Sequence, residues 1–229
     1  MKTIIISGAG GNLGTVTVKK FLDSGYRVIA VDSHAGAPDF AIKQEQFDFA
    51  SVDLTNEKES ADFINGVILK YGKIDGAIML VGGFAAGNLE VTGGEDLDRM
   101  FSLNFKTAYF ITRPLLGHMK ENRYGRLVFI GARPALQPDQ GKDLLAYALS
   151  KSLLFKLADF INEDTKGENI AAAVVVPSTI DTAINRQNMP AVDPGNWVKA
   201  EALADILEFI FSEKGAVMRE TVIKAYNNA

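Results

Sequence analysis

The sequence predicts an α/β protein of one domain, residues 1–229, built on a doubly wound parallel sheet of the Rossmann type. Short apolar runs, typical of parallel strands buried on both faces, alternate along the chain with longer segments of helical periodicity. The first run, residues 4–6, leads into Gly8, Gly11 and Gly14, a spacing that suits a tight turn and close approach of the backbone to a pyrophosphate. Ligands should therefore bind where the strands end.

The glycine turn is followed by an expected helix over residues 12–24, whose first amides, at Asn12 and Leu13, offer a site for an anion. The second strand, residues 27–31, ends at Asp32. An acidic residue about 20 residues beyond the glycines accepts hydrogen bonds from the adenosine ribose hydroxyls and repels a 2′-phosphate. We therefore predict NADH rather than NADPH as the cofactor. A glycine turn without a ligand is the alternative, which the surrounding strand and helix disfavour.

The remaining elements alternate in the same way. Strands are expected over residues 47–52, 75–81, 126–130, 170–176 and 221–225, and helices over residues 56–71, 95–122, 144–164 and 199–211. Asn56 is the expected N-cap of the first of these helices and Gly72 its expected end, and Pro114 predicts a kink in the second. The helix over residues 144–164 is apolar on more than one side, which predicts packing on the sheet with one face and on a second subunit with another.

Composition disfavours several classes of protein. The net charge is −4 and no basic stripe is present, so the expected partner is a small molecule rather than nucleic acid or a membrane. The absence of cysteine excludes disulfides and thiol catalysis. No apolar run is long enough to span a bilayer, and Met1 leads almost directly into the first strand, so we expect a cytoplasmic protein. The two histidines, His34 and His118, lack ligand spacing, and no metal is expected.

Tyr147 and Lys151 carry the predicted chemistry. They lie four residues apart in the expected helix over residues 144–164, so both project from one face. A neighbouring ammonium, together with a positive nicotinamide ring, lowers the pKa of the phenol, which allows Tyr147 to act as the general acid for a hydride acceptor. Lys151 can also bind the nicotinamide ribose. An incidental surface pair would be the better interpretation in a chain without the glycine turn.

The whole chain resembles the short-chain dehydrogenase/reductase family. Beside the glycine turn and Asp32, the matching residues are Asp53 and Leu54, Gly82 and Gly83 after the fourth strand, Asn104, Tyr147 and Lys151. The resemblance implies that Asp53 and Leu54 hold the adenine and that Gly82 and Gly83 contact the cofactor. It also implies that Asn104 anchors a water that relays protons from Lys151. A purely structural role for Asn104 is the alternative.

Two departures from the family pattern point to one branch of it. Gly131 and Ala132 occupy the place of the usual serine after the fifth strand, and the fourth strand ends in VGGFAAG. Both features resemble the quinonoid dihydropteridine reductases, and the segment over residues 171–197 is similar to that branch as well. By this analogy, residues 185–197 form a lid over the substrate, with a mobile surface loop as the alternative. The residues that would line the nicotinamide and pyrophosphate are Pro177, Thr179, Ile180 and Thr182.

The missing serine bears on the substrate. In the reduction of a ketone, the substrate oxygen develops negative charge and benefits from two hydrogen-bond donors. Without the serine one donor is missing, which costs about 2–4 kcal/mol of transition-state stabilisation. A quinonoid pterin instead spreads the charge over a ring that Tyr147 alone can protonate. Phe84 is expected to stack on such a ring, with a core position as the alternative. The other expected substrate contacts are Ala132, Arg133, Met189 and Trp197, and for Trp197 pinning of the last helix is an equal alternative.

The sequence thus predicts an NADH-dependent oxidoreductase that reduces a flat conjugated heterocycle, most concretely a quinonoid dihydropterin, as a homodimer or a tetramer. One alternative is an NAD-dependent carbonyl or alcohol dehydrogenase of the same family, in which Ser178 or Gln137 replaces the missing serine. Another is a non-catalytic NAD-sensing protein, which the presence of both Tyr147 and Lys151 disfavours.

Overall fold

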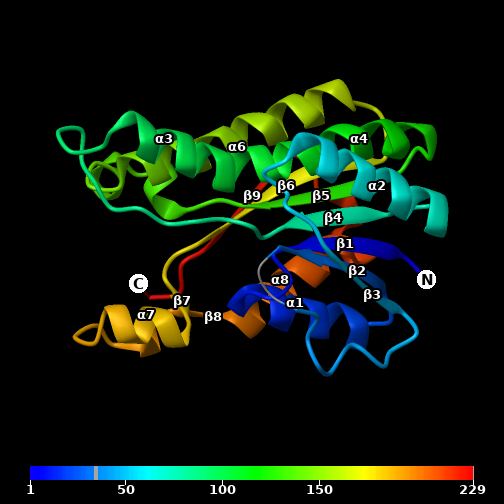
Figure 1. The fold of residues 1–229 in the computed structure, drawn as a ribbon, viewed down its shortest axis with the longest axis horizontal. Helices are drawn as coiled ribbons and strands as arrows, with labels where there is room; N and C mark the ends of the chain where they lie inside the picture. Colours follow the sequence, from blue (N-terminus) through cyan, green and yellow to red (C-terminus); the bar gives the residue numbers. More distant parts are fainter. Residues whose placement is uncertain (34–35, 229) are drawn as a thin grey trace.

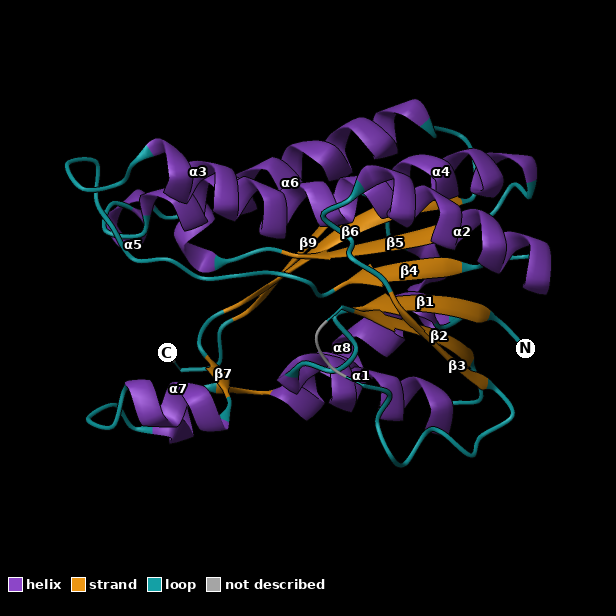
Figure 2. Cartoon of the chain, in the orientation of Figure 1, coloured by secondary structure: helices purple, strands orange, loops and turns teal. Residues whose placement is uncertain are grey.

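Seven parallel strands form the central sheet of the computed structural model, which describes residues 1–33 and 36–228 (Figure 1 and Figure 2). In chain order the strands are β1 (Thr3–Ser7), β2 (Arg27–Asp32), β3 (Phe47–Ser51), β4 (Gly76–Met79), β5 (Gly125–Ile130), β6 (Ile170–Pro177) and β9 (Thr221–Ala225). Across the sheet the order is β3-β2-β1-β4-β5-β6-β9, and each neighbouring pair is parallel. This is the predicted doubly wound topology, and the order reverses between β1 and β4, where a ligand crevice is expected.

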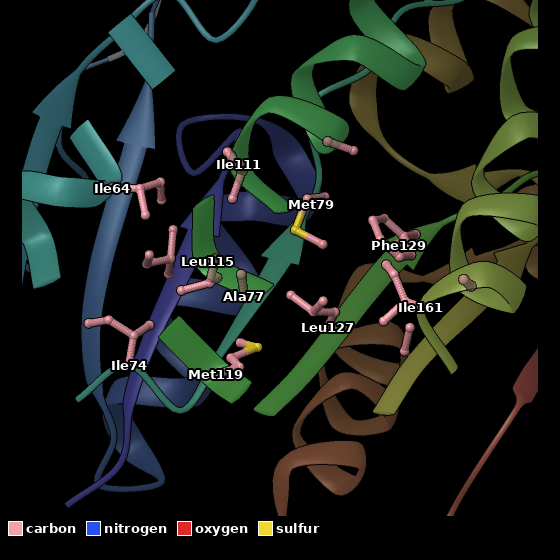
Figure 3. Close-up of a cluster of buried hydrophobic side chains, with 14 of the residues drawn as sticks. Ile64, Ile74, Ala77, Met79, Ile111, Leu115, Met119, Leu127, Phe129 and Ile161 are labelled. Carbon is pink, nitrogen blue, oxygen red and sulfur yellow. The ribbon is translucent and has the colours of Figure 1, made fainter. Parts of the chain in front are cut away.

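Helices cover both faces of the sheet (Figure 2). One face carries α2 (Glu57–Tyr71), α4 (Thr107–Glu121) and α6 (Leu145–Asp164), and the other carries α1 (Asn12–Asp23) and α8 (Ala200–Phe211). Each face has its own apolar core, because side chains alternate across a strand. Ile5 of β1 belongs to the cluster under α2, α4 and α6, whereas Ile4 and Ile6 belong to the cluster over α1 and α8. Figure 3 shows part of the first cluster, in which Ile161 lies beside Phe129.

Local signals placed the helix ends well. The side chain of Asn56 accepts hydrogen bonds from the amides of Lys58 and Glu59, so it caps α2 as predicted. Gly72 ends that helix with a φ of 74°, a conformation that favours glycine. The structure describes no helix long and apolar enough to cross a membrane within residues 1–33 and 36–228.

The helix expected over residues 95–122 is divided in a way that the sequence did not indicate. Its parts are α3 (Gly94–Phe101), a π-helical turn (Ser102–Lys106) and α4. The prediction placed the irregularity at Pro114, but α4 continues across Pro114, and the change of helical hydrogen bonding lies in the π-turn. That turn contains the buried Asn104, and π-turns within helices are often found at functional sites.

Short elements that the sequence did not predict shape the region over the carboxyl edge of the sheet. They are α5 (Pro138–Gly141), β7 (Ile180–Asp181), α7 (Ala183–Asn188) and β8 (Val198–Lys199). Strands β7 and β8 pair with each other, so the expected lid over residues 185–197 starts and ends at one small ladder. In Figure 1 this part of the chain, coloured orange, lies on the same side of the sheet as α1 and α8.

Candidate active site

The glycine turn after β1 is held by backbone contacts that leave no room for side chains. Gly8 has a φ of 66°, and a β-carbon there would lie 2.9 Å from the amide nitrogen of Val81. A β-carbon at Gly14 would lie 2.0 Å from the carbonyl oxygen of Gly8, so α1 packs directly on the turn. Helix α1, which is described throughout, has no side-chain hydrogen bond at its N-cap Gly11 and no acidic residue in its first turn. Its N-terminal amides therefore remain suited to an anion.

A cleft of about 360 Å³ opens beside this turn. The described residues that line it include Gly8, Gly11, Asp32, Ser33, Val52, Asp53, Leu54, Thr55, Leu80, Val81, Gly82, Leu103 and Thr107. The fold thus brings together six of the residues that the sequence assigned to the cofactor, from the ends of β1, β2 and β4 and the segment after β3. The lining residues that are described include two aspartates and no lysine or arginine.

Other predicted cofactor residues lie outside this lining. They are Asn12, Leu13, Gly14, Gly83, Pro177, Thr179, Ile180 and Thr182, together with Tyr147 and Lys151. Glycine is needed at position 14 because the backbone there packs directly on Gly8. Thr182 accepts a hydrogen bond from the amide of Asn185 and caps α7, while the side chain of Asn185 donates to the carbonyl of Ile180 at 2.8 Å. These contacts give the start of the lid a defined conformation.

Asp32 ends β2 at the rim of the cleft. Its Oδ2 accepts a hydrogen bond of 3.1 Å from the amide of Gly10, which holds the carboxylate next to the glycine turn. The predicted selector of the cofactor is thus placed by two strands that are neighbours in the sheet but separated in the sequence.

Lys151 is buried, and its Nζ donates a hydrogen bond of 2.9 Å to the carbonyl oxygen of Ile130 at the end of β5. Burial lowers the pKa of the ammonium to about 8. Tyr147 is half-buried one turn earlier in α6, and burial raises the pKa of its phenol to about 12. Desolvation of the phenolate dominates this pKa in the protein alone, and the expected lowering by Lys151 together with a positive nicotinamide ring stays a prediction.

Asn104 joins the end of β4 to α6, the helix that carries Tyr147 and Lys151. The amide of Gly83 donates to Asn104 Oδ1 at 2.8 Å, and Asn104 Nδ2 donates both to the carbonyl of Gly83 at 3.1 Å and to Ser150 Oγ at 2.9 Å. The side-chain amide is thus engaged by protein groups, as in the structural role that the sequence left open. Gly82 permits this arrangement, because a β-carbon there would lie 2.7 Å from Asn104 Oδ1 and 3.2 Å from Lys151 Nζ.

Ser150 was not found by sequence reasoning. Its hydroxyl donates to the carbonyl of Tyr147 at 2.8 Å and accepts from Asn104, so it connects the predicted acid to the π-turn. The sequence could have indicated it, because Ser150 lies three residues after Tyr147 and so projects from a similar side of the helix.

Phe84 lies beside the predicted acid. Its side chain is 66% exposed, which excludes the core position, and its ring meets the Tyr147 ring edge to face with 5.2 Å between centroids. Ala132, in the place of the usual serine, is buried and offers no hydroxyl. Arg133 follows it and holds its guanidinium 5.1 Å from the centroid of the Tyr226 ring.

Trp197 belongs to a different part of the molecule. It is buried, its carbonyl accepts a hydrogen bond of 3.0 Å from the side chain of Asn227, and it borders a second cavity together with Ala202 and Ile206 of α8. Among the residues that the structure describes, none lines both this cavity and the cleft beside the glycine turn. Trp197 thus lies beside α8 and away from the cleft at the glycine turn, and both alternatives for it stay predictions. Met189 follows α7 as its C-cap.

The histidines show no metal-binding geometry in the part of the chain that is described. His118 accepts a hydrogen bond from the amide of Ile74 at its Nε2, at 3.2 Å, and burial lowers its pKa. His34 lies outside the described residues. Across residues 1–33 and 36–228, no group of three or more His, Cys, Asp or Glu side chains is arranged to hold a metal ion.

Comparisons with known proteins show the family of this chain. A family model described as short chain dehydrogenase matches residues 2–193. The 3-oxoacyl-[acyl-carrier-protein] reductase FabG of Thermotoga maritima is 23% identical over 97% of this chain and 95% of its own length. The cyclic-di-GMP-binding biofilm dispersal mediator protein of Escherichia coli is 30% identical over 84% of this chain and 78% of its own length.

Solved structures match the fold. ElxO with NADP bound superposes with a TM-score of 0.88 at 19% identity, covering 97% of this chain and 96% of its own. An NAD⁺-bound xylitol dehydrogenase superposes with a TM-score of 0.86 at 17% identity, covering 99% of this chain and 98% of its own.

Proposed function

This chain belongs to the short-chain dehydrogenase family, and from that premise we propose that it reduces a flat conjugated heterocycle with NADH, most concretely a quinonoid dihydropterin. One observation carries the proposal. The exposed ring of Phe84 lies edge to face with the ring of Tyr147, while the place of a second hydroxyl donor is taken by the buried Ala132. A flat acceptor that stacks on an aromatic ring and needs one proton donor fits this pair of features.

The residues of the cleft fit a dinucleotide. The turn around Gly8 and Gly11 with the free start of α1 would hold the pyrophosphate, Asp32 the adenosine ribose, and Asp53 with Leu54 the adenine. NADH supplies a hydride when it is bound in this family of sites. The two aspartates of the lining oppose the extra charge of a 2′-phosphate, which supports NADH. The solved relatives carry either dinucleotide, so the family alone leaves this choice open.

Tyr147 would donate the proton. Its raised pKa keeps the phenol protonated until negative charge develops on the acceptor, and the buried ammonium of Lys151 on the same helix then favours the phenolate. Asn104 would hold the end of β4 and the Tyr147 turn in a fixed relation through Gly83 and Ser150. Asn104 Oδ1 accepts a hydrogen bond from the amide of Gly83, and its second lone pair could accept one from the water that relays protons from Lys151.

The outer faces of α4 and α6 support the expected homodimer. Leu149 and Phe160 of α6 are 44% and 70% exposed, and Tyr109 of α4 is 39% exposed. Large apolar side chains on two adjacent helices are typical of a surface that a second copy covers. Assembly of two such dimers into a tetramer is the alternative.

A carbonyl or alcohol dehydrogenase is the second candidate, and the name of the Thermotoga relative favours it. In that case another donor must replace the missing serine. The hydroxyl of Ser178 donates to the carbonyl of Tyr226 at 2.6 Å, so it would have to give up this bond, and Gln137 is the other candidate. A non-catalytic binding protein is the third, suggested by the name of the Escherichia coli relative.

The deciding experiment measures NADH oxidation in two parallel assays. One contains quinonoid dihydropterin generated in situ as the acceptor, and the other a panel of ketones and quinones. Turnover of the pterin that falls by about 100-fold or more in Tyr147→Phe supports the proposed function. Turnover of ketones alone would establish the second candidate. Tight NADH binding that is indifferent to Tyr147→Phe, with no turnover of any acceptor, would establish the third.

A further inference from the structure

The segment after β4 runs along the start of the catalytic helix and contacts it at three successive points. Gly83 reaches Ser150 through the side chain of Asn104, and the ring of Phe84 meets the ring of Tyr147. Gly87 pairs with the residues just before and at the start of α6. Figure 2 shows this segment passing α5 on its way from β4 to α3.

The third contact is a parallel β-bridge between Gly87 and Leu144. The amide of Gly87 donates to the carbonyl of Asp143 at 2.8 Å, and the amide of Leu145 donates to the carbonyl of Gly87 at 2.8 Å. Leu145 is the first residue of α6, and Tyr147 is the third. The bridge is therefore attached two residues before the proposed acid.

This bridge supplies the cap that α6 lacks locally. The first amides of a helix have no partner within the helix. Helix α6, all of which is described, has no side-chain hydrogen bond at its N-cap Leu144 and no acidic residue in its first turn. The carbonyl of Gly87 instead accepts from the first helical amide, from a segment more than 50 residues earlier in the chain.

The backbone at Gly87 requires glycine. Its φ is 154°, a conformation that other residues rarely adopt, and a β-carbon there would lie 2.9 Å from Thr92 Oγ1. That hydroxyl is fixed in turn, because it donates to the carbonyl of Asn88 at 2.7 Å and closes a tight turn over residues 88–92. A side chain at position 87 must therefore shift either this turn or the bridge.

We propose that Gly87 is a positioning residue for Tyr147: its backbone bridge to Asp143 and Leu145 fixes the first turn of α6 and so sets where the phenol lies relative to Phe84 and the acceptor. Gly87 contributes no side chain and touches neither the cofactor lining nor the phenol itself. The inference rests on the proposed function only in taking Tyr147 as the acid.

The test compares Gly87→Val with Gly93→Ala, a matched control in the same loop where a β-carbon meets nothing within 4 Å. We expect Gly87→Val to lower kcat about 10- to 100-fold, because small displacements of a catalytic group have effects of this size. KM for NADH should stay within about twofold, because Gly87 lies outside the cofactor cleft. Gly93→Ala should match the wild type in both quantities. Equal kcat in Gly87→Val and wild type would overturn the proposal.

A second measurement is independent of any acceptor. Hydrogen exchange at the amide of Leu145, followed on peptides covering residues 143–149, should be faster in Gly87→Val and unchanged in Gly93→Ala, while peptides from the C-terminal half of α6 keep wild-type protection. If no acceptor is turned over by the wild type, the proposed function fails and this exchange pattern still decides the positioning role. Unchanged exchange at Leu145 would show that the bridge does not hold the turn. Should Gly87→Val fail to bind NADH, Gly87→Ala takes its place in both measurements.

Discussion

Lys151 donates a hydrogen bond of 2.9 Å from its Nζ to the carbonyl oxygen of Ile130, which ties α6 to the last residue of β5. The contact places a buried ammonium at the carboxyl edge of the sheet, between the strand that precedes Ala132 and the π-turn that carries Asn104. The carbonyl oxygen replaces part of the hydration that the ammonium loses on burial.

The pH dependence of activity should report this ammonium. Burial lowers the pKa of Lys151 to about 8, so the charged form is complete well below pH 8 and is lost as the pH rises through that value. We expect kcat/KM for NADH, which reports groups of the free enzyme, to fall above about pH 8. Lys151→Arg should move this fall to higher pH, because guanidinium stays protonated. A wild-type profile that is flat to pH 10 would contradict this assignment.

Cofactor choice should depend on Asp32. Replacing it in Asp32→Ala removes the carboxylate that lies at the rim of the cleft and accepts from the amide of Gly10. We expect the ratio of kcat/KM for NADH to that for NADPH to fall by about tenfold or more, because repulsion of the 2′-phosphate is lost. Asp23→Ala, in an exposed ion pair with Lys19 at the end of α1, is the control and should leave the ratio unchanged. The same ratio in both variants would show that Asp32 is not the selector.

Substrate preference should depend on Phe84. The variant Phe84→Ala removes an exposed ring that contacts Tyr147, so we expect kcat/KM for a pterin to fall by about tenfold, through loss of about 1.4 kcal/mol of stacking. Small aliphatic ketones, which gain little from stacking, should be affected less. Leu89→Ala, an exposed apolar residue of the same loop, serves as the control. Equal losses for pterin and ketone would mean that Phe84 only supports the position of Tyr147.

Stability at acid pH should depend on His118. Its neutral Nε2 accepts from the buried amide of Ile74, and burial lowers its pKa in the folded state below the ordinary value of 6.5. The stability that this neutral form contributes is complete above pH 6.5 and is lost as the pH falls below it, because the unfolded chain takes up the proton first. We expect His118→Leu to lower the free energy of unfolding at pH 8 by about 1–3 kcal/mol, since the amide of Ile74 loses its acceptor.

Denaturant unfolding at a series of pH values measures this effect. The difference between wild type and His118→Leu should shrink from pH 8 to pH 5. A difference that is constant over this range would show that His118 is protonated equally in the folded and unfolded chain.

The sequence alone determined the features that depend only on residues adjacent in the chain, namely the strands, the glycine turn and the helix ends. The alternation of apolar runs placed the seven strands of the sheet, the glycines marked the turn after β1, and Asn56 and Gly72 marked the ends of α2. Each of these features follows from local backbone geometry or from side-chain periodicity, which a single chain segment carries by itself. The meeting of six predicted residues at one cleft followed as well, because parallel strands bring their ends to one edge of the sheet.

Only the tertiary structure decided how the predicted catalytic groups are held. Asn104, in the π-turn, bonds to Gly83 and to Ser150 of α6, and the ring of Phe84, in the segment after β4, meets the ring of Tyr147. Desolvation likewise sets the direction of both pKa shifts, raising that of Tyr147 and lowering that of Lys151. Such contacts join residues that lie far apart in the sequence, and burial is a property of the packed whole, so no local pattern of residues could specify them.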